Sequence, residues 1–173
     1  MPDLTIALMG NPNAGKTTIF NALTGLHQHT GNWPGKTVEK KEGVIERDDT
    51  TINIVDLPGT YSLTAYSPEE IIARDFIIEE HPDVVINVVD ATNLERNLYL
   101  TVQILELDVP VVLALNMTDD LQKDGSKINL DQLSQLLGGI PVVSTTANQG
   151  KGISDLVAKA IKAAQKNRKF RVS

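Results

Sequence analysis

The sequence contains no cysteine and few aromatic residues, which make up 4% of its 173 residues. Without cysteine the chain can form neither a disulfide nor a thiolate metal site, a composition typical of proteins in a reducing compartment. The longest apolar runs are interrupted by Asn87, Asp90 and Asn116 well before they reach the length of a membrane span. The N-terminus also lacks the cationic region and apolar segment of a signal peptide. We therefore expect this stretch of chain to be cytosolic.

Basic residues are the less frequent charge, with 16 Lys and Arg against 22 Asp and Glu, and the net charge is −6. An acidic balance argues against a nucleic acid as the main partner. The exception is a C-terminal stretch without any acid after Asp155, which contains Lys159, Lys162, Lys166, Arg168, Lys169 and Arg171. We interpret these residues as the solvated outer face of a terminal helix, and attraction to an anionic membrane surface is the alternative.

The most informative segment is GNPNAGKT at 10–17, which follows an apolar run at 4–9. Glycine at the turns lets the backbone N–H groups surround a triphosphate. Lys16 begins the expected next helix, where it can reach the β- and γ-phosphates, and the Thr17 hydroxyl can bind Mg²⁺. The predicted nucleotide-binding residues of this P-loop are Gly10, Asn11, Pro12, Asn13, Ala14, Gly15, Lys16, Thr17 and Thr18.

The segment 25–41 has no apolar periodicity and contains glycine and proline, so it is predicted to be a long mobile loop. Loops of that length within a domain are usually functional, and one that follows a P-loop helix is where a nucleotide-sensing switch would lie. Thr37 is the candidate to complete the Mg²⁺ shell when a γ-phosphate is present. Gly35 and Lys36 are predicted to approach the nucleotide with it.

Two strands at 43–47 and 51–55 are predicted to form a hairpin, and the second runs into Asp56-Leu57-Pro58-Gly59. A carboxylate at the end of a strand can hold Mg²⁺ through water, and Gly59 can bring its N–H close to a γ-phosphate. The pattern D-x-x-G gains weight because it follows a P-loop at this spacing. We therefore assign all four residues, Asp56, Leu57, Pro58 and Gly59, to the nucleotide site.

The tetrapeptide Asn116-Met117-Thr118-Asp119 follows a predicted buried strand at 110–115. Guanine presents N1–H and an N2 amine side by side, and the Asp119 carboxylate can accept from both, whereas adenine offers a lone pair at N1. Losing two charge-assisted hydrogen bonds, each worth about 1.5–3 kcal/mol, discriminates strongly between the bases. Asn116 is expected to brace the loop. The predicted base-binding residues are Asn116, Met117, Asp119, Thr145, Thr146 and Ala147, the last through a backbone N–H to guanine O6.

Two other pairs of residues suggest chemistry less strongly. His27 and His29 lie in the predicted loop, but two histidines without carboxylates or cysteines are more often solvated than metal-binding. Glu69 and Glu70 follow Ser67 and Pro68, a sequence typical of a helix start with a capping box. We interpret these carboxylates as capping residues rather than catalytic ones.

Together these patterns predict an α/β fold of the P-loop NTPase G-domain class. The expected sheet is mostly parallel and six-stranded, with one antiparallel edge strand at 43–47, and about five helices flank it. The helices are predicted at 18–23, 68–81, 97–107, 130–137 and 153–164. A GTP-binding domain is expected over residues 1–166, followed by a basic tail at 167–173.

The chain from residue 4 to about 166 resembles a Ras-like GTPase domain, and more closely the cytosolic G domain of FeoB-type ferrous iron transporters. The likeness rests on the P-loop and on the segments GNWPGKTVE at 31–39, DLPGTYSL at 56–63 and DATNLERNL at 90–98. The resemblance implies GTP and Mg²⁺ binding, slow hydrolysis to GDP and two nucleotide-sensing switches. It also implies a helical domain and a membrane permease downstream, so that this chain is expected to be an excised cytoplasmic piece of an inner or cell membrane protein.

The resemblance assigns catalytic roles to Lys16, Asn13, Thr37 and Gly59. In potassium-activated GTPases, which this chain resembles, an Asn at the position of Asn13 helps to bind K⁺. A turn residue that tolerates an unusual backbone angle is the alternative interpretation of Asn13.

The chain departs from the general Ras-like pattern at three positions. Met117 replaces a common Lys, which predicts weak nucleotide affinity and fast GDP release. Thr60 stands where a water-orienting Gln is usual, so intrinsic turnover is expected at or below about 10⁻⁴ to 10⁻³ per second. Lys36 stands where the family more often has an apolar residue.

Two other functions share parts of this pattern. A soluble GTPase in ribosome or tRNA maturation has the same form of P-loop, although the acidic balance disfavours it. A binding module that holds nucleotide without useful hydrolysis is the third possibility. The sequence predicts no nucleic acid partner, and it leaves a homo-oligomer open.

Overall fold

The computed structural model describes residues 2–64, 66–123 and 125–172. A seven-stranded sheet forms its centre, with strands in the order β2-β3-β4-β1-β5-β6-β7. The strands are β1 (Leu4–Gly10), β2 (Gln28–Asn32), β3 (Glu39–Arg47), β4 (Thr50–Asp56), β5 (Val84–Asp90), β6 (Val111–Asn116) and β7 (Val142–Ser144). The α-helices are α1 (Lys16–Thr24), α2 (Pro68–Glu80), α3 (Leu94–Leu105), α4 (Thr118–Lys123), α5 (Leu130–Leu136) and α6 (Ile153–Val172). Two 3₁₀ turns, η1 (Ala91–Asn93) and η2 (Ala147–Gln149), precede α3 and α6.

The sheet is mostly parallel, as predicted. Strand β1 pairs in parallel with β4 and β5, and β5, β6 and β7 continue in parallel. Strand β3 is antiparallel to both of its neighbours, β2 and β4. The predicted α/β class is confirmed, and β1 occupies the centre of the sheet, which places the segment after Gly10 at the middle of the sheet's carboxyl edge.

The prediction of a mobile loop over 25–41 was wrong at 28–32 and 39–41, because these residues belong to strands β2 and β3. Residues Gln28–Asn32 form strand β2, which pairs with β3 in the register Gln28↔Gly43 to Asn32↔Glu39. All but the first residue of β2 are exposed, so no apolar alternation could reveal the strand in the sequence. The backbone ladder with β3 holds it in place. The sheet therefore has seven strands rather than six, and β2 takes the edge position predicted for β3.

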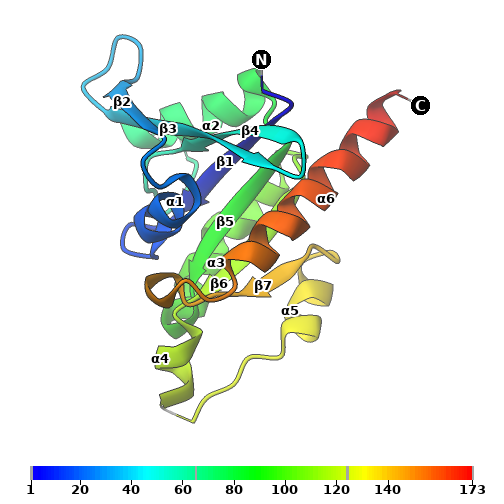
Figure 1. Ribbon diagram of the computed structural model, residues 1–173. Coiled ribbons are helices and arrows are strands. Elements are labelled where there is room, and N and C mark those ends of the chain that lie inside the picture. Colours follow the sequence, from blue (N-terminus) through cyan, green and yellow to red (C-terminus); the bar gives the residue numbers. More distant parts are fainter. Residues whose placement is uncertain (1, 65, 124, 173) are drawn as a thin grey trace.

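Helices cover both faces of the sheet (Figure 1), and their apolar side chains pack against it. On one face α1 contributes Ile19 and Phe20, and α6 contributes Leu156, Ala160 and Ala164. On the other face the main contributors are Ile72 and Ile77 of α2 with Leu100 and Ile104 of α3. These clusters leave the carboxyl edge of the sheet to the loops that carry the predicted site.

The ends of several helices match their sequence signals. Ser67 caps α2 by accepting a hydrogen bond from the Glu70 N–H at 3.1 Å, as predicted. Helix α6 continues to Val172, so it includes residues 167–172 of the segment predicted as a basic tail. In the part of the chain that the structure covers, no helix combines the length and hydropathy needed to cross a membrane.

Candidate functional site

The P-loop connects the end of β1 to the start of α1 with an unusual backbone. The Ala14 N–H donates to the Asn11 carbonyl at 3.1 Å, and both Asn13 (φ 70°) and Gly15 (φ 97°) have positive φ. A Cβ at Gly15 would lie 2.0 Å from Nδ2 of Asn116. Glycine is therefore required at this position both by the backbone angle and by the space.

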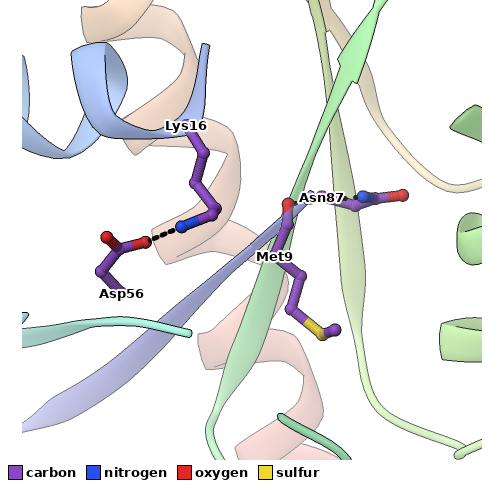
Figure 2. Close-up of polar contacts among 4 residues, drawn as sticks. All are labelled: Met9, Lys16, Asp56 and Asn87. Atoms are coloured by element: carbon purple, nitrogen blue, oxygen red, sulfur yellow. Dashed lines mark hydrogen bonds and ion pairs between the residues drawn. The ribbon is translucent and has the colours of Figure 1, made fainter. Parts of the chain in front are cut away.

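Lys16 and Asp56 form an ion pair between the start of α1 and the end of β4 (Figure 2). The two side chains are only 10% and 9% exposed. Burial raises the pKa of the Asp56 carboxyl, and this effect exceeds the opposing influence of the Lys16 ammonium. The two residues predicted to contact phosphate and Mg²⁺ are thus neighbours in the fold.

The segment after Asp56 runs alongside the P-loop. The Leu57 N–H donates to the Leu8 carbonyl and the Thr60 N–H donates to the Gly10 carbonyl, each at 3.1 Å. A Cβ at Gly59 would lie 3.4 Å from atoms of Pro12, which shows how closely the two loops approach. The Gly59 backbone is therefore held at the mouth of the P-loop, as its predicted role requires.

Asn116 joins the P-loop to the predicted base-binding loops. Its Nδ2 donates to the Ala14 carbonyl at 3.0 Å, and its Oδ1 accepts from Thr145 Oγ1 at 3.0 Å and from the Ala147 N–H at 3.1 Å. The predicted bracing role of Asn116 is thus seen in its contacts. The Ala147 N–H, expected to donate to guanine O6, is directed at Asn116 Oδ1 in this structure.

The remaining base-binding candidates lie around the start of α4. Met117 has a positive φ of 64°, and Asp119 stands in the first turn of α4. The Asp119 Oδ2 accepts a hydrogen bond from Gln149 Nε2 at 3.3 Å, which links α4 to η2. Thr146 exchanges backbone hydrogen bonds with Lys151, and these fix the loop between β7 and α6.

A cavity of about 580 Å³ opens over the P-loop. It is lined by Asn11, Pro12, Asn13, Gly15, Lys16, Thr17 and Thr18, with Gly59 and Met117 at its sides. Segments far apart in the sequence therefore converge on one cavity with backbone N–H groups, an ammonium and a hydroxyl. Such a donor set suits a phosphate chain with a hard cation.

The predicted switch residues Gly35, Lys36 and Thr37 are exposed and do not line that cavity. They lie in the connection between β2 and β3, which Trp33 fastens to α2. The Trp33 ring packs edge-on against Phe76 at 5.8 Å between centroids, and Lys40 Nζ lies 4.8 Å from the Trp33 ring. Trp33 is buried, so the start of the connection between β2 and β3 has a defined position against α2.

The two weaker candidate pairs take ordinary places. His27 and His29 are exposed, and no group of three or more metal-binding side chains occurs within the described residues. The Glu70 carboxylate accepts from the Thr64 hydroxyl at 2.8 Å, and this hydrogen bond lowers its pKa. Glu70 thereby ties the segment after Gly59 to the start of α2.

Asn87 is a polar residue for which the sequence motifs predict no role. It is buried in β5, where it donates to the Met9 carbonyl at 3.4 Å (Figure 2) and also accepts from the Thr101 hydroxyl of α3. It therefore connects the strand that leads into the P-loop with α3. A polar residue inside an otherwise β-branched strand was the available signal, because a buried amide needs hydrogen-bond partners.

Comparisons with known proteins agree with this geometry. A family model described as ferrous iron transport protein B matches residues 4–160. The Fe(2+) transporter FeoB of Escherichia coli (strain K12) is 52% identical over 160 residues, which cover 90% of this chain and 21% of the transporter. The chain thus spans about a fifth of the length of the curated relatives it matches.

Solved structures resemble the chain equally well. A mutant of S. thermophilus NFeoB bound to GDP is 53% identical with a TM-score of 0.86, covering 91% of this chain and 61% of that one. The cytosolic domain of the T. maritima FeoB iron transporter in a GDP form is 49% identical with a TM-score of 0.89, covering 94% of this chain and 63% of that one.

Proposed function

Because the chain belongs to the ferrous iron transport protein B family and has the fold of its GTPase domain, we propose that it binds GTP with Mg²⁺ and hydrolyses it slowly to GDP. The observation that carries this proposal is the convergence at Asn116. One side chain bonds to the P-loop at Ala14 and to the base-binding loops at Thr145 and Ala147. A single guanine nucleotide can therefore contact the phosphate-binding and base-binding loops at once.

In the proposed mechanism Lys16 and the P-loop amides bind the phosphates. A bound phosphate would compete with Asp56 for the Lys16 ammonium, and a carboxylate that loses this partner is then free to hold a cation. The oxygen atoms of Thr17 and Asp56 are ligands of the kind that Mg²⁺ prefers, and Thr37 is the proposed third contributor. Mg²⁺ would neutralise charge on the phosphates.

Gly59 is proposed to assist hydrolysis, and Thr60 accounts for its proposed slow rate. The Gly59 backbone lies at the P-loop, where its N–H can stabilise charge that develops on the γ-phosphate. Thr60 is 4% exposed, and its buried hydroxyl has no hydrogen-bond partner in the described part of the chain. A short hydroxyl held in the interior cannot orient an attacking water as a longer amide side chain would, so turnover is expected to be slow.

K⁺ is the proposed activator. The amide of Asn13 lines the cavity beside the P-loop, and an amide oxygen is a suitable ligand for a monovalent cation. K⁺ would supply positive charge near the bridge between the β- and γ-phosphates. The positive φ of Asn13 also fits the alternative role of a turn residue.

A binding and turnover assay tests these proposals. We expect GTP and GDP to bind much more tightly than ATP, and single-turnover phosphate release to require Mg²⁺. Equal affinity for ATP would contradict the guanine assignment. Binding without phosphate release would make the chain a pure binding module.

The role of Asn13 is tested by comparing hydrolysis in KCl and NaCl. We expect faster hydrolysis in KCl for the parent chain and equal rates in both salts for Asn13→Ala. Equal rates for the parent would remove the K⁺ role and leave Asn13 as a turn residue.

The wider role is that of a nucleotide switch that regulates Fe²⁺ transport by downstream helical and transmembrane domains of the same polypeptide. The support is the family membership and the length of the relatives. In this proposal the chain lies on the cytoplasmic side of the cell membrane. Fe²⁺ uptake by cells that carry the longer polypeptide should fall when Asp119 is replaced by Ala, and unchanged uptake would contradict the regulatory role.

A further inference from the structure

The segment that follows Gly59, Thr60–Thr64, lies along α3 and is bound to it at two points. The Arg96 guanidinium is centred 4.4 Å from the Tyr61 ring. Farther along, the Leu63 N–H donates to Oε1 of Gln103 at 2.5 Å, and the Leu63 side chain is buried. Two residues of one helix, seven positions apart, therefore hold both ends of this short segment.

Helix α3 is itself fixed to the sheet by buried polar contacts. Asn97 accepts from the Asp90 N–H at 3.2 Å and donates to the Asn93 carbonyl at 2.8 Å. One turn later Thr101 donates to Asn87, which in turn donates to the Met9 carbonyl of β1. Because these bonds tie α3 to β1 and β5, the helix is a firm support for a segment bound to its surface.

A small polar cavity of about 170 Å³ separates the P-loop from α3. Its lining includes Asn11 and Asn13 of the P-loop, Tyr61, and Asp90 and Arg96. The Asn11 side chain is 3% exposed, and neither of its polar atoms has a partner among the residues described. The Arg96–Tyr61 contact therefore lies next to the loop that binds the phosphates.

Arg96 contacts the Tyr61 ring without forming an ion pair among the described residues. No carboxylate lies within 4.0 Å of Arg96 in the described ranges, whereas Arg74 of α2 is paired with Asp75 at 3.8 Å. A guanidinium over an aromatic ring is worth about 0.5–1 kcal/mol at an exposed site, which corresponds to about a two- to fivefold change in an equilibrium.

We propose that Arg96 and Gln103 are positioning residues for GTP hydrolysis, which act by holding Thr60–Thr64 on α3 and thereby Gly59 against the P-loop. The inference rests on the proposed GTPase function. Thr60 has one backbone bond to Gly10 on the P-loop side, and on the other side the α3 contacts anchor the segment together with the Thr64–Glu70 hydrogen bond to α2. A donor that stabilises developing charge is effective only if its position is fixed before the reaction.

The test compares single variants in a steady-state hydrolysis assay. Arg96→Met keeps an unbranched, flexible stem and removes the guanidinium, and Tyr61→Leu removes the ring. For each we expect kcat to fall about two- to fivefold, with KM for GTP, GDP affinity and Tm close to those of the parent. Gln103→Ala should lower kcat similarly, because Leu63 loses its hydrogen bond.

Three controls separate positioning from a general structural effect. Tyr61→Phe keeps the ring and should retain the parent kcat. The double variant Arg96→Met/Tyr61→Leu should be no slower than the slower single variant, because both changes remove the same contact. Arg74→Met, which removes an arginine from the neighbouring helix α2, should leave kcat unchanged.

An unchanged or increased kcat in Arg96→Met, or additive losses in the double variant, would overturn this positioning proposal. The proposed GTPase function would still stand, provided that the parent chain hydrolyses GTP. A parent chain that releases no phosphate would overturn both.

Discussion

At the residue scale, we propose that the carboxylate of Asp119 determines which base is bound. It stands in the first turn of α4 and contacts only the exposed amide of Gln149 among the hydrogen bonds described for it. Asp119→Ala should weaken GDP binding at least about a hundredfold, because two charge-assisted hydrogen bonds are lost. Calorimetric titration with GDP measures this effect.

The neighbouring Asp120 provides a matched control. It is paired with Lys123 at 3.6 Å on the exposed side of α4, and such pairs contribute little. Asp120→Ala should therefore change GDP affinity less than about twofold. Asp119→Asn should reverse the preference, because its amide donor fits the C2 carbonyl of xanthine and not the amine of guanine. Retained GDP binding in either Asp119 variant would contradict the assignment.

Gly15 is constrained by its neighbour as well as by its backbone angle. Gly15→Ala should lower the free energy of unfolding by about 1–3 kcal/mol more than Gly138→Ala, because the new methyl group displaces the Asn116 amide. Gly138 is the matched control, since its φ of 84° is similar and a Cβ there meets no atom within 4 Å. Urea denaturation of both variants gives the comparison, and equal losses would contradict the steric explanation.

Asp56 should make stability depend on pH. Its pKa is raised in the folded chain, so the folded state binds the proton more tightly than the unfolded state does. Its contribution to stability is therefore complete below the ordinary aspartate pKa, about pH 4, and is lost as the pH rises through the folded pKa. The stability of the parent relative to Asp56→Asn should decrease as the pH rises from about 4 toward neutrality.

The measurement is urea unfolding of the two proteins at a series of pH values. The Asp56→Asn side chain keeps the size of the carboxyl group and does not titrate, so the difference between the proteins isolates Asp56. A difference that stays constant or grows in favour of the parent with rising pH would show that the Lys16 ion pair outweighs burial.

At the element scale, the β2–β3 connection is the part that must move if Thr37 is to reach the nucleotide. It is fastened to α2 by Trp33, which is the only tryptophan of the sequence. We expect a non-hydrolysable GTP analogue with Mg²⁺ to change Trp33 fluorescence, whereas GDP leaves it near that of the free chain. Thr37→Ala should abolish the fluorescence change that is specific to the analogue. An equal change with GDP would contradict a movement of the β2–β3 connection that depends on the γ-phosphate.

The sequence predicted the elements whose signals are local. Ser67 and Pro68 marked the start of α2, the buried strand predicted at 110–115 matches β6, and the segments 43–47 and 51–55 marked the hairpin of β3 and β4. Asp48 and Asp49 lie at the turn of that hairpin, and both residues have positive φ as a tight hairpin turn requires. The P-loop, Asp56 and Asn116 could be predicted to lie together, because motifs that serve one ligand follow one another at a typical spacing in the sequence.

The elements that were missed depend on contacts between distant segments. Strand β2 has exposed side chains and exists through its pairing with β3. Arg96 and Gln103 look like ordinary polar positions of a helix until the fold brings Tyr61 and Leu63 beside them. The short helix α4 begins at Thr118, inside the tetrapeptide 116–119 that is predicted to bind the base, and no helix is predicted there.

At the scale of the whole molecule, nucleotide binding should stabilise the entire fold, because the ligand bridges loops from both halves of the sheet. At a GDP concentration about 100 times Kd the free energy of unfolding should rise by about 2.7 kcal/mol, or about 5–10 °C in Tm. Thermal unfolding followed by circular dichroism measures this shift. ATP at the same concentration is the control, and an equal shift with ATP would contradict guanine selectivity.

The strand order has a consequence for what the molecule can report. Strand β1 divides the sheet, so the residues proposed to contact the base follow β6 and β7 on one flank, while Asp56 and the Trp33–Thr37 connection belong to the other flank. In this arrangement the base and the number of phosphates are recognised on opposite flanks of the sheet. A partner that contacts only the β2–β4 flank would therefore distinguish the triphosphate from the diphosphate without changing the affinity for guanine.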